Sequence, residues 1–117
     1  MQMRKFEVDG KEITFVNDHR DTSTGFAHDT TMFINGIETT HATQYWCNRT
    51  WERYGYQTVM RRAVYDLKDR REGALKAQFM ADKGYKRMTA DRAVEFEAFK
   101  RKDDKAEFYE KLLKALE

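Results

Sequence analysis

The chain has 117 residues, the size of one ordinary domain, and its formal net charge of +2 does not by itself point to a partner. Its aromatic content of 14% is too high for a disordered chain, and no apolar run reaches the roughly 18 residues of a membrane span. The N-terminus lacks the apolar stretch of a secretion signal and Cys47 is the single cysteine, so we expect a cytoplasmic protein without disulfides or membrane contact.

Two Asx-Gly pairs indicate β-hairpins in the first part of the chain. Asp9-Gly10 and Asn35-Gly36 each lie between alternating apolar and polar residues. Asx-Gly is the preferred pair for a type I′ turn, because both central residues of that turn need a positive φ. The polar stretch over 17–24 is expected to be the loop between the hairpins. The pattern predicts an antiparallel β-meander of three to four strands within residues 4–40.

The hydrophobic period changes after Thr43 and becomes that of a helix. Apolar residues then recur every three or four positions, which predicts a long helix from near Thr43 to about residue 71. The sequence leaves open whether Gly73 breaks this helix, and Gly84 is expected to end its continuation. The residues that form the predicted apolar stripe are Tyr56, Val59, Met60, Ala63, Val64 and Leu67.

Capping residues indicate further helices towards the C-terminus. Thr89, followed by Asp91 in the first turn, suits an N-cap, and Asp103-Asp104 can cap a short final helix. We therefore expect an α+β fold in a single domain over residues 1–117. Residues 1–42 would form the β-meander, and residues 43–117 would form one long helix with one or two further helices.

Four side chains invite a metal-binding or catalytic interpretation: His19, His28, His41 and Cys47. Structural zinc sites usually contain paired ligands roughly two to four residues apart, and these residues lack that spacing. His41 with Cys47 is the minimal pair for a thiol nucleophile, so a small thiol-dependent enzyme stays an alternative. The simpler interpretation of ordinary surface and core residues is preferred, and we expect no metal, no cofactor and no catalytic activity.

The segment over residues 43–56 is the most unusual in the chain, since it holds both tryptophans, three tyrosines and two arginines. Arginine and aromatic residues are enriched in binding hot spots. They can equally pack a helix onto the sheet, and both interpretations stay open. A second basic cluster surrounds Tyr85. The residues predicted to contact a partner are Trp46, Arg49, Arg53, Tyr54, Arg61, Arg62, Lys83, Tyr85, Lys86 and Arg87.

Residues 39–54, with the sequence TTHATQYWCNRTWERY, precede a charged helix. This combination of an aromatic, arginine-containing segment and a charged helix resembles small accessory proteins of phages and mobile elements of Gram-positive bacteria, a group that includes anti-CRISPR inhibitors. The resemblance implies a protein that acts stoichiometrically in the host cytoplasm on a host protein or ribonucleoprotein complex. Anti-CRISPR proteins share no motif, so the resemblance assigns no functional residue.

Three functions are therefore compared. The preferred hypothesis is a non-enzymatic binding protein that inhibits or modulates a host nucleic-acid-handling complex. The alternatives are a direct DNA- or RNA-binding protein and the thiol-dependent enzyme. Direct nucleic-acid binding is disfavoured because residues 1–42 carry a net charge of −3, although residues 43–65 carry +3. The oligomeric state is left open, and a homodimer is one option.

Overall fold

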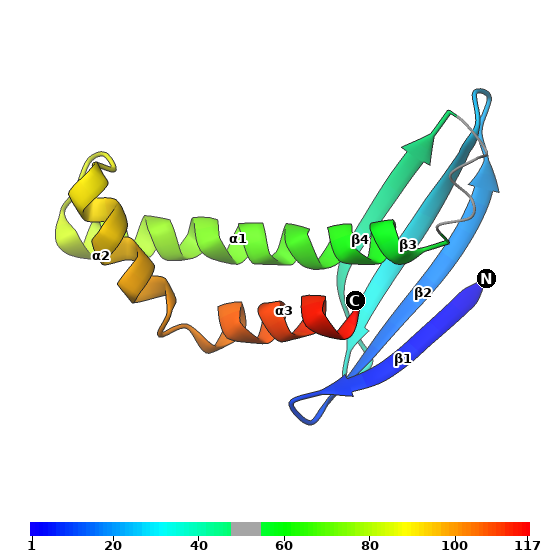
Figure 1. Ribbon diagram of the computed structural model, residues 1–117, viewed down its shortest axis with the longest axis horizontal. Coiled ribbons are helices and arrows are strands. Elements are labelled where there is room, and N and C mark those ends of the chain that lie inside the picture. The colour runs from blue at the N-terminus through cyan, green and yellow to red at the C-terminus, as the bar shows by residue number, and fades with distance from the viewer. Residues whose placement is uncertain (48–54) are drawn as a thin grey trace.

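The computed structural model describes residues 1–47 and 55–117 and has the expected α+β fold (Figure 1). The strands form one antiparallel sheet in chain order, made of β1 (Gln2–Val8), β2 (Lys11–Asp21), β3 (Phe26–Ile34) and β4 (Ile37–Trp46). The helices that follow are α1 (Gln57–Lys83), α2 (Ala90–Lys100) and α3 (Asp104–Ala115). None of the described helices is both long and apolar enough to cross a membrane. The prediction of a meander, a long helix and further helices is confirmed.

The two Asx-Gly pairs form the hairpin turns that the sequence predicts. Asp9 and Gly10 have φ values of 52° and 76°, and Asn35 and Gly36 have 51° and 79°. Both central residues of each turn thus have the left-handed conformation, in which asparagine, aspartate and glycine are tolerated. Asn35 also accepts a hydrogen bond from the backbone N–H of Glu12, at 2.9 Å, which ties the second turn to β2.

The strands extend further than the sequence suggested. β2 includes most of the polar stretch that was expected to be a loop, since it runs to Asp21. β4 continues to Trp46, so the prediction that a helix begins near Thr43 is wrong. The reason is pairing: Trp46 lies opposite Phe26, and every residue of β3 up to that end has a partner in β4. Gly25 precedes β3 where a Cβ would collide with the carbonyl oxygen of Trp46.

The helix boundaries follow the capping signals closely. Gly84 ends α1 with a φ of 72°. The Thr89 side chain accepts a hydrogen bond from the first turn of α2, and that of Asp103 accepts one from α3. Gly73 does not break α1, which is continuous through it. An interior glycine costs a helix only about 1 kcal/mol relative to alanine, and the packing of both halves of α1 outweighs that penalty.

The main core lies between one face of the sheet and two helices, the first half of α1 and α3 (Figure 1). Asn17 and Thr30 are the fully buried polar residues of this layer, and Thr30 donates a 2.6 Å hydrogen bond to Asn17. The largest fully buried apolar side chains of this core are Ile13, Phe15 and Met32 of the sheet, Val59 and Val64 of α1, and Leu112 and Leu116 at the C-terminal end.

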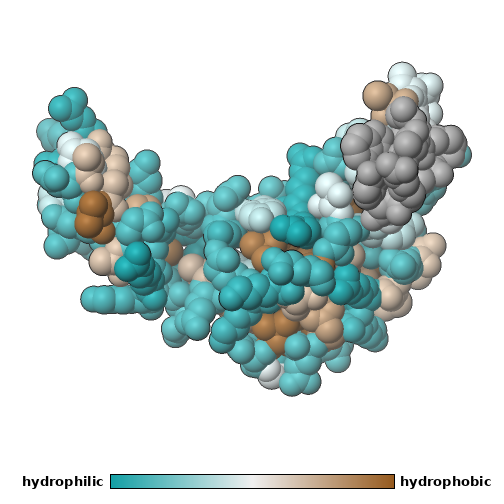
Figure 2. Space-filling view, in the orientation of Figure 1, coloured by the Kyte–Doolittle hydropathy of each residue, from teal (hydrophilic) through white to brown (hydrophobic). Residues whose placement is uncertain are grey.

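The second half of α1 projects beyond the sheet and pairs with α2. We call residues 73–102 the arm; its own small core consists of Leu75, Phe79 and Phe96. The radius of gyration is 17.2 Å, whereas a compact domain of this length has about 13 Å. Figure 2 shows the resulting outline, with the sheet and the arm at the two ends of a concave surface. The chain is therefore elongated.

Candidate binding surfaces

The sheet has an open face, opposite to the face that α1 and α3 cover. Side chains alternate between the two faces of a strand, and the register with the buried residues identifies the members of each. In the described part of the chain no helix packs on this second face. Its side chains are Met3, Lys5 and Glu7 of β1, Glu12, Thr14, Val16, Asp18 and Arg20 of β2, Ala27, Asp29, Thr31 and Phe33 of β3, and Glu38, His41, Thr43 and Tyr45 of β4.

The open face is acidic, and its carboxylates are placed against one another. Glu7 lies directly opposite Glu12 across β1 and β2, and Asp18 lies directly opposite Asp29 across β2 and β3. Like charges in directly opposed positions destabilise a sheet. The carboxylate residues of the open face are Glu7, Glu12, Asp18, Asp29 and Glu38, against the two cations Lys5 and Arg20.

One of these carboxylates is held in a polar network at the β4 side. Arg20 donates from Nε to Asp29 at 2.9 Å and from its terminal nitrogen to the Tyr45 hydroxyl at 3.1 Å. Thr43 donates to the other Asp29 oxygen at 2.6 Å. Burial raises the pKa of Asp29, but the hydrogen bonds from Thr43 and Arg20 outweigh it and hold that pKa below its ordinary value. Asp29 is therefore ionised, and the positive charge of Arg20 balances its charge. The network fixes the Arg20 and Tyr45 side chains.

Of the remaining carboxylates of the open face, one is in an ion pair and three are not. Asp18 lies 3.8 Å from the N-terminal amine, and both groups are more than half exposed. Among the residues described by the structure, no ion pair engages Glu7, Glu12 or Glu38, and all three are exposed. At the β1–β2 end of the open face Glu7 and Glu12 thus lie beside the single cation Lys5, and this end is negative on balance.

Trp46 belongs to an aromatic cluster on the covered face. Its ring stacks on Phe26 at 5.2 Å and meets His28 edge-on at 4.9 Å, while Tyr56 lies 4.5 Å from His28. The prediction placed Trp46 on the outside of a helix, whereas it is a half-buried strand residue that packs the end of the sheet. Three other predicted partner-binding residues, Arg49, Arg53 and Tyr54, lie outside the described residues.

Arg61 and Arg62 lie in the first turns of α1, far from the second predicted basic cluster. Arg62 donates to Gln44 of β4 at 3.0 Å, and Arg61 is 3.5 Å from the Tyr65 hydroxyl. They line a shallow hollow of about 530 Å³ beside β4. Because a helix rises about 1.5 Å per residue, Arg61 is about 33 Å from Lys83 along α1. The two groups that the sequence analysis combined into one set cannot form one site.

The second predicted cluster forms the end of the arm. Lys83 is the last residue of α1, and Tyr85, Lys86 and Arg87 lie in the loop that leads to α2. Lys83, Lys86 and Arg87 are exposed, whereas Tyr85 is half-buried. The structure therefore brings these four residues together, as predicted. We call Lys83, Lys86 and Arg87 the tip cations.

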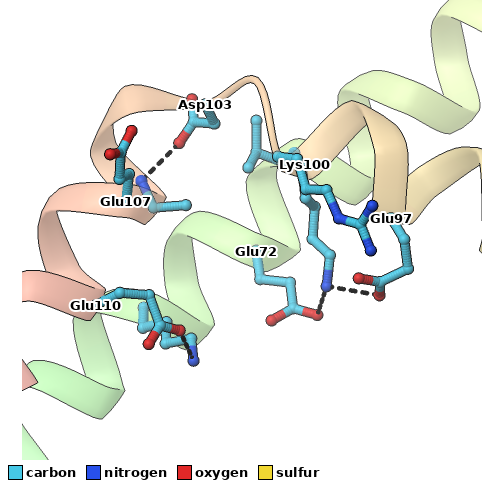
Figure 3. A pocket seen from close by; sticks show the side chains of 10 residues that line it. Glu72, Glu97, Lys100, Asp103, Glu107 and Glu110 are labelled. Atoms are coloured by element: carbon cyan, nitrogen blue, oxygen red, sulfur yellow. Dashed lines mark hydrogen bonds and ion pairs between the residues drawn. The ribbon is translucent and has the colours of Figure 1, made fainter.

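A charged pocket of about 470 Å³ lies where the three helices meet (Figure 3). Lys100 of α2 reaches between Glu72 of α1, at 3.0 Å, and Glu97, at 2.9 Å. Beside it, Arg71 makes a double hydrogen bond to Asp103, at 2.6 and 3.0 Å. The hydrogen bond from Arg71 lowers the pKa of Asp103. These charges are paired with one another, and the ion pairs hold the three helices together.

The residues considered for catalysis are not assembled. His41 is on the open face within β4, and Cys47 follows the end of that strand, so about 20 Å of extended chain separates them. A thiol nucleophile and its base must be within hydrogen-bond reach of each other, which this pair is not. Over residues 1–47 and 55–117 no three His, Cys, Asp or Glu side chains are grouped so that they could hold a metal ion.

The acidic open face is the feature that the sequence analysis missed. Glu7 and Glu12 are equidistant from the Asp9-Gly10 turn, so the predicted hairpin already places them opposite each other. The second pair, Asp18 and Asp29, could not be identified because that part of β2 was expected to be a loop. A comparison of the chain with protein families, curated proteins and solved structures found no match.

Proposed function

We propose that the protein is a non-enzymatic binding protein that inhibits or modulates a nucleic-acid-handling complex of a host cell. The acidic open face is the surface that binds this partner. One observation carries the proposal: the open face is covered by no described helix and holds the directly opposed carboxylates Glu7 and Glu12, which no ion pair of the described residues engages. Stoichiometric action on such a complex, for example a CRISPR effector, is what the resemblance to phage and mobile-element proteins implies.

Charge complementarity is the physical reason for this choice of partner. Proteins that handle nucleic acid bind the phosphate backbone with clustered lysine and arginine residues, so their channels are strongly basic. A sheet face with a surplus of carboxylates fits such a channel and is attracted to it over long range. The free carboxylates would take the positions that phosphates otherwise occupy, and the partner would be blocked without any bond being made or broken.

The stability penalty of the open face also supports a binding role. Directly opposed like charges in a sheet destabilise it by roughly 0.2–1 kcal/mol relative to neutral pairs. Threonine has a higher strand propensity than glutamate, and this sheet carries it at Thr14 and Thr31 of the same face. Carboxylates at Glu7 and Glu12 are therefore less favourable for the fold than threonines at the same positions would be.

The proposal is tested with affinity-tagged protein in bacterial lysate. The test variant is Glu7→Gln/Glu12→Gln, and the matched control is Asp69→Asn/Asp82→Asn, which makes the same change in net charge at exposed positions of α1. Wild type and control are expected to retain the same set of nucleic-acid-handling proteins. The test variant is expected to retain at least 10-fold less of these proteins. Excess duplex DNA should release the same proteins. Equal retention by the folded test variant would reject the proposal.

A further inference from the structure

The tip cations are held without carboxylate partners. In the described part of the chain no ion pair engages Lys83, Lys86 or Arg87. Five lysine and arginine side chains elsewhere in the described part of the chain are in ion pairs, whereas others, such as Lys105 and Lys114, are in none, like the tip cations. The paired cations are Arg20 with Asp29, Lys68 with Glu110, Arg71 with Asp103, Lys100 with Glu72 and Glu97, and Lys111 with Asp9 and Glu107.

The loop that carries Lys86 and Arg87 is fixed in place. The Tyr85 ring packs edge-on against Phe79 at 5.8 Å, and the Arg92 guanidinium lies 4.0 Å from its centroid. The Tyr85 hydroxyl donates to Glu95 at 3.0 Å. Arg92 also donates to the backbone carbonyl of Arg87, at 3.0 Å. The tip cations therefore extend from a rigid platform, and substituting their side chains removes none of these contacts.

The tip is also electrically separate from the acidic sheet. α1 still contacts the sheet at Arg70, which donates to Thr40 of β4 at 3.0 Å. From Arg70 to Lys83 the helix rises about 20 Å, which exceeds the Debye length of about 8 Å at physiological salt. The arm alone carries a net charge of +4, although the chain as a whole carries +2. A ligand at the tip is therefore attracted by the arm and not repelled by the open face.

We propose that the tip of the arm binds the phosphate backbone of nucleic acid, without reading its sequence. The tip presents three long cationic side chains, and the half-buried ring of the neighbouring Tyr85 already packs against Phe79 and Arg92. A protein partner would need an exposed aromatic or apolar anchor at the centre of the contact, and repeated phosphates need only the cations. This proposal concerns the opposite end of the molecule from the open face and does not rest on the proposed function.

The test measures binding of the full chain to a fluorescein-labelled duplex of about 20 base pairs by fluorescence anisotropy. Three neutralised phosphates give a slope of about −2.7 for log affinity against log salt concentration. Raising the salt from about 50 to about 200 mM should then weaken binding about 40-fold. The Lys86→Glu/Arg87→Glu variant should bind at least 10-fold more weakly at the lower salt. The Lys105→Glu/Lys114→Glu control, with the same change in charge on exposed positions of α3, should bind like the wild type.

Several outcomes would overturn the proposal. They are the absence of wild-type binding at the lower salt, binding that salt does not weaken, and equal losses in the tip variant and the α3 control. A tip variant that keeps its affinity for DNA but loses a protein partner would assign the tip to protein recognition, and the proposal would be wrong. Thermal melting of each variant checks that it is folded. The salt dependence of wild-type binding tests the proposal without any variant. The Glu7→Gln/Glu12→Gln variant should bind DNA normally, which separates this proposal from the proposed function.

Discussion

Neutralising one carboxylate of the open face should make the protein more stable and less able to bind its partner. In the Glu12→Gln variant the repulsion between residues 7 and 12 disappears, because they are direct cross-strand neighbours. Both side chains are exposed, so solvent screens the interaction and the gain should lie at the lower end of the range for cross-strand pairs, about 0.3–0.5 kcal/mol. For a chain of 117 residues the unfolding entropy is about 0.25 kcal/mol per degree, so the melting temperature should rise by about 1–2 °C.

A double-mutant cycle isolates this repulsion. Glu7→Gln alone should stabilise the protein as much as Glu12→Gln alone, and the double variant should add almost nothing, since one neutral partner already removes the repulsion. Glu38→Gln is the matched control, because Glu38 lies opposite Phe33 and has no carboxylate across from it. The gain should vanish in about 1 M salt, where the Debye length is about 3 Å. If Glu38→Gln stabilises as much as Glu12→Gln, or if the singles add fully in the double variant, the pairwise repulsion that we infer does not exist.

Three further predictions concern the framework that presents the two surfaces. Gly73→Ala should stabilise the protein by about 1 kcal/mol in urea unfolding, because Gly73 is within a continuous helix and a Cβ there would meet no other atom; a destabilised variant would mean that α1 needs a flexible centre. Gly25→Ala should destabilise by about 1–3 kcal/mol, because the new Cβ would collide with the Trp46 carbonyl; an unchanged melting temperature would show that β4 does not approach this turn. Asp103 has a lowered pKa in the folded state, so the stability from its bond to Arg71 is present above the ordinary aspartate pKa and is lost as pH falls through the lowered value. Asp103→Ala should cost about 1 kcal/mol near neutral pH, partly through loss of the α3 cap, and a difference that does not shrink below that pKa would contradict the contribution assigned to the Arg71 bond.

Local signals in the sequence predicted the order of elements well. The turns at Asp9-Gly10 and Asn35-Gly36 and the helix ends at Gly84, Thr89 and Asp103 depend on a few neighbouring residues, and all were confirmed. These features are predictable because the conformation of a turn or a cap is decided within about four residues.

The ends of the strands could not be predicted in the same way. Thr43 to Trp46 combines residues that suit a strand as well as a helix, and only pairing with β3 across the sheet decides between them. The polar end of β2 is a strand for the same reason, since Asp18 and its neighbours pair with β3 although their composition is that of a loop. Both errors changed the expected surface, because they moved Trp46 outwards and left the second carboxylate pair unrecognised.

The separation of the arm from the sheet is also a tertiary property. It arises because α3, and not α2, returns to cover the sheet beside α1, which leaves the second half of α1 paired with α2 alone. Each of these helices has an apolar stripe, with Phe96 buried on α2 and Phe108, Leu112 and Leu113 buried on α3. Sequence periodicity shows that each helix has a buried face but not which core that face joins.

The most direct test of the central claim is a competition experiment with the host complex that the pull-down identifies. The host complex is first bound to labelled nucleic acid, and the Lys86→Glu/Arg87→Glu variant is then titrated in. In this variant the open face is intact and the tip cannot hold DNA. If carboxylates of the open face occupy the partner's basic channel, nucleic acid and the variant exclude each other, and adding Glu7→Gln/Glu12→Gln to the same chain abolishes the exclusion. A stable ternary complex of partner, nucleic acid and variant would contradict the account.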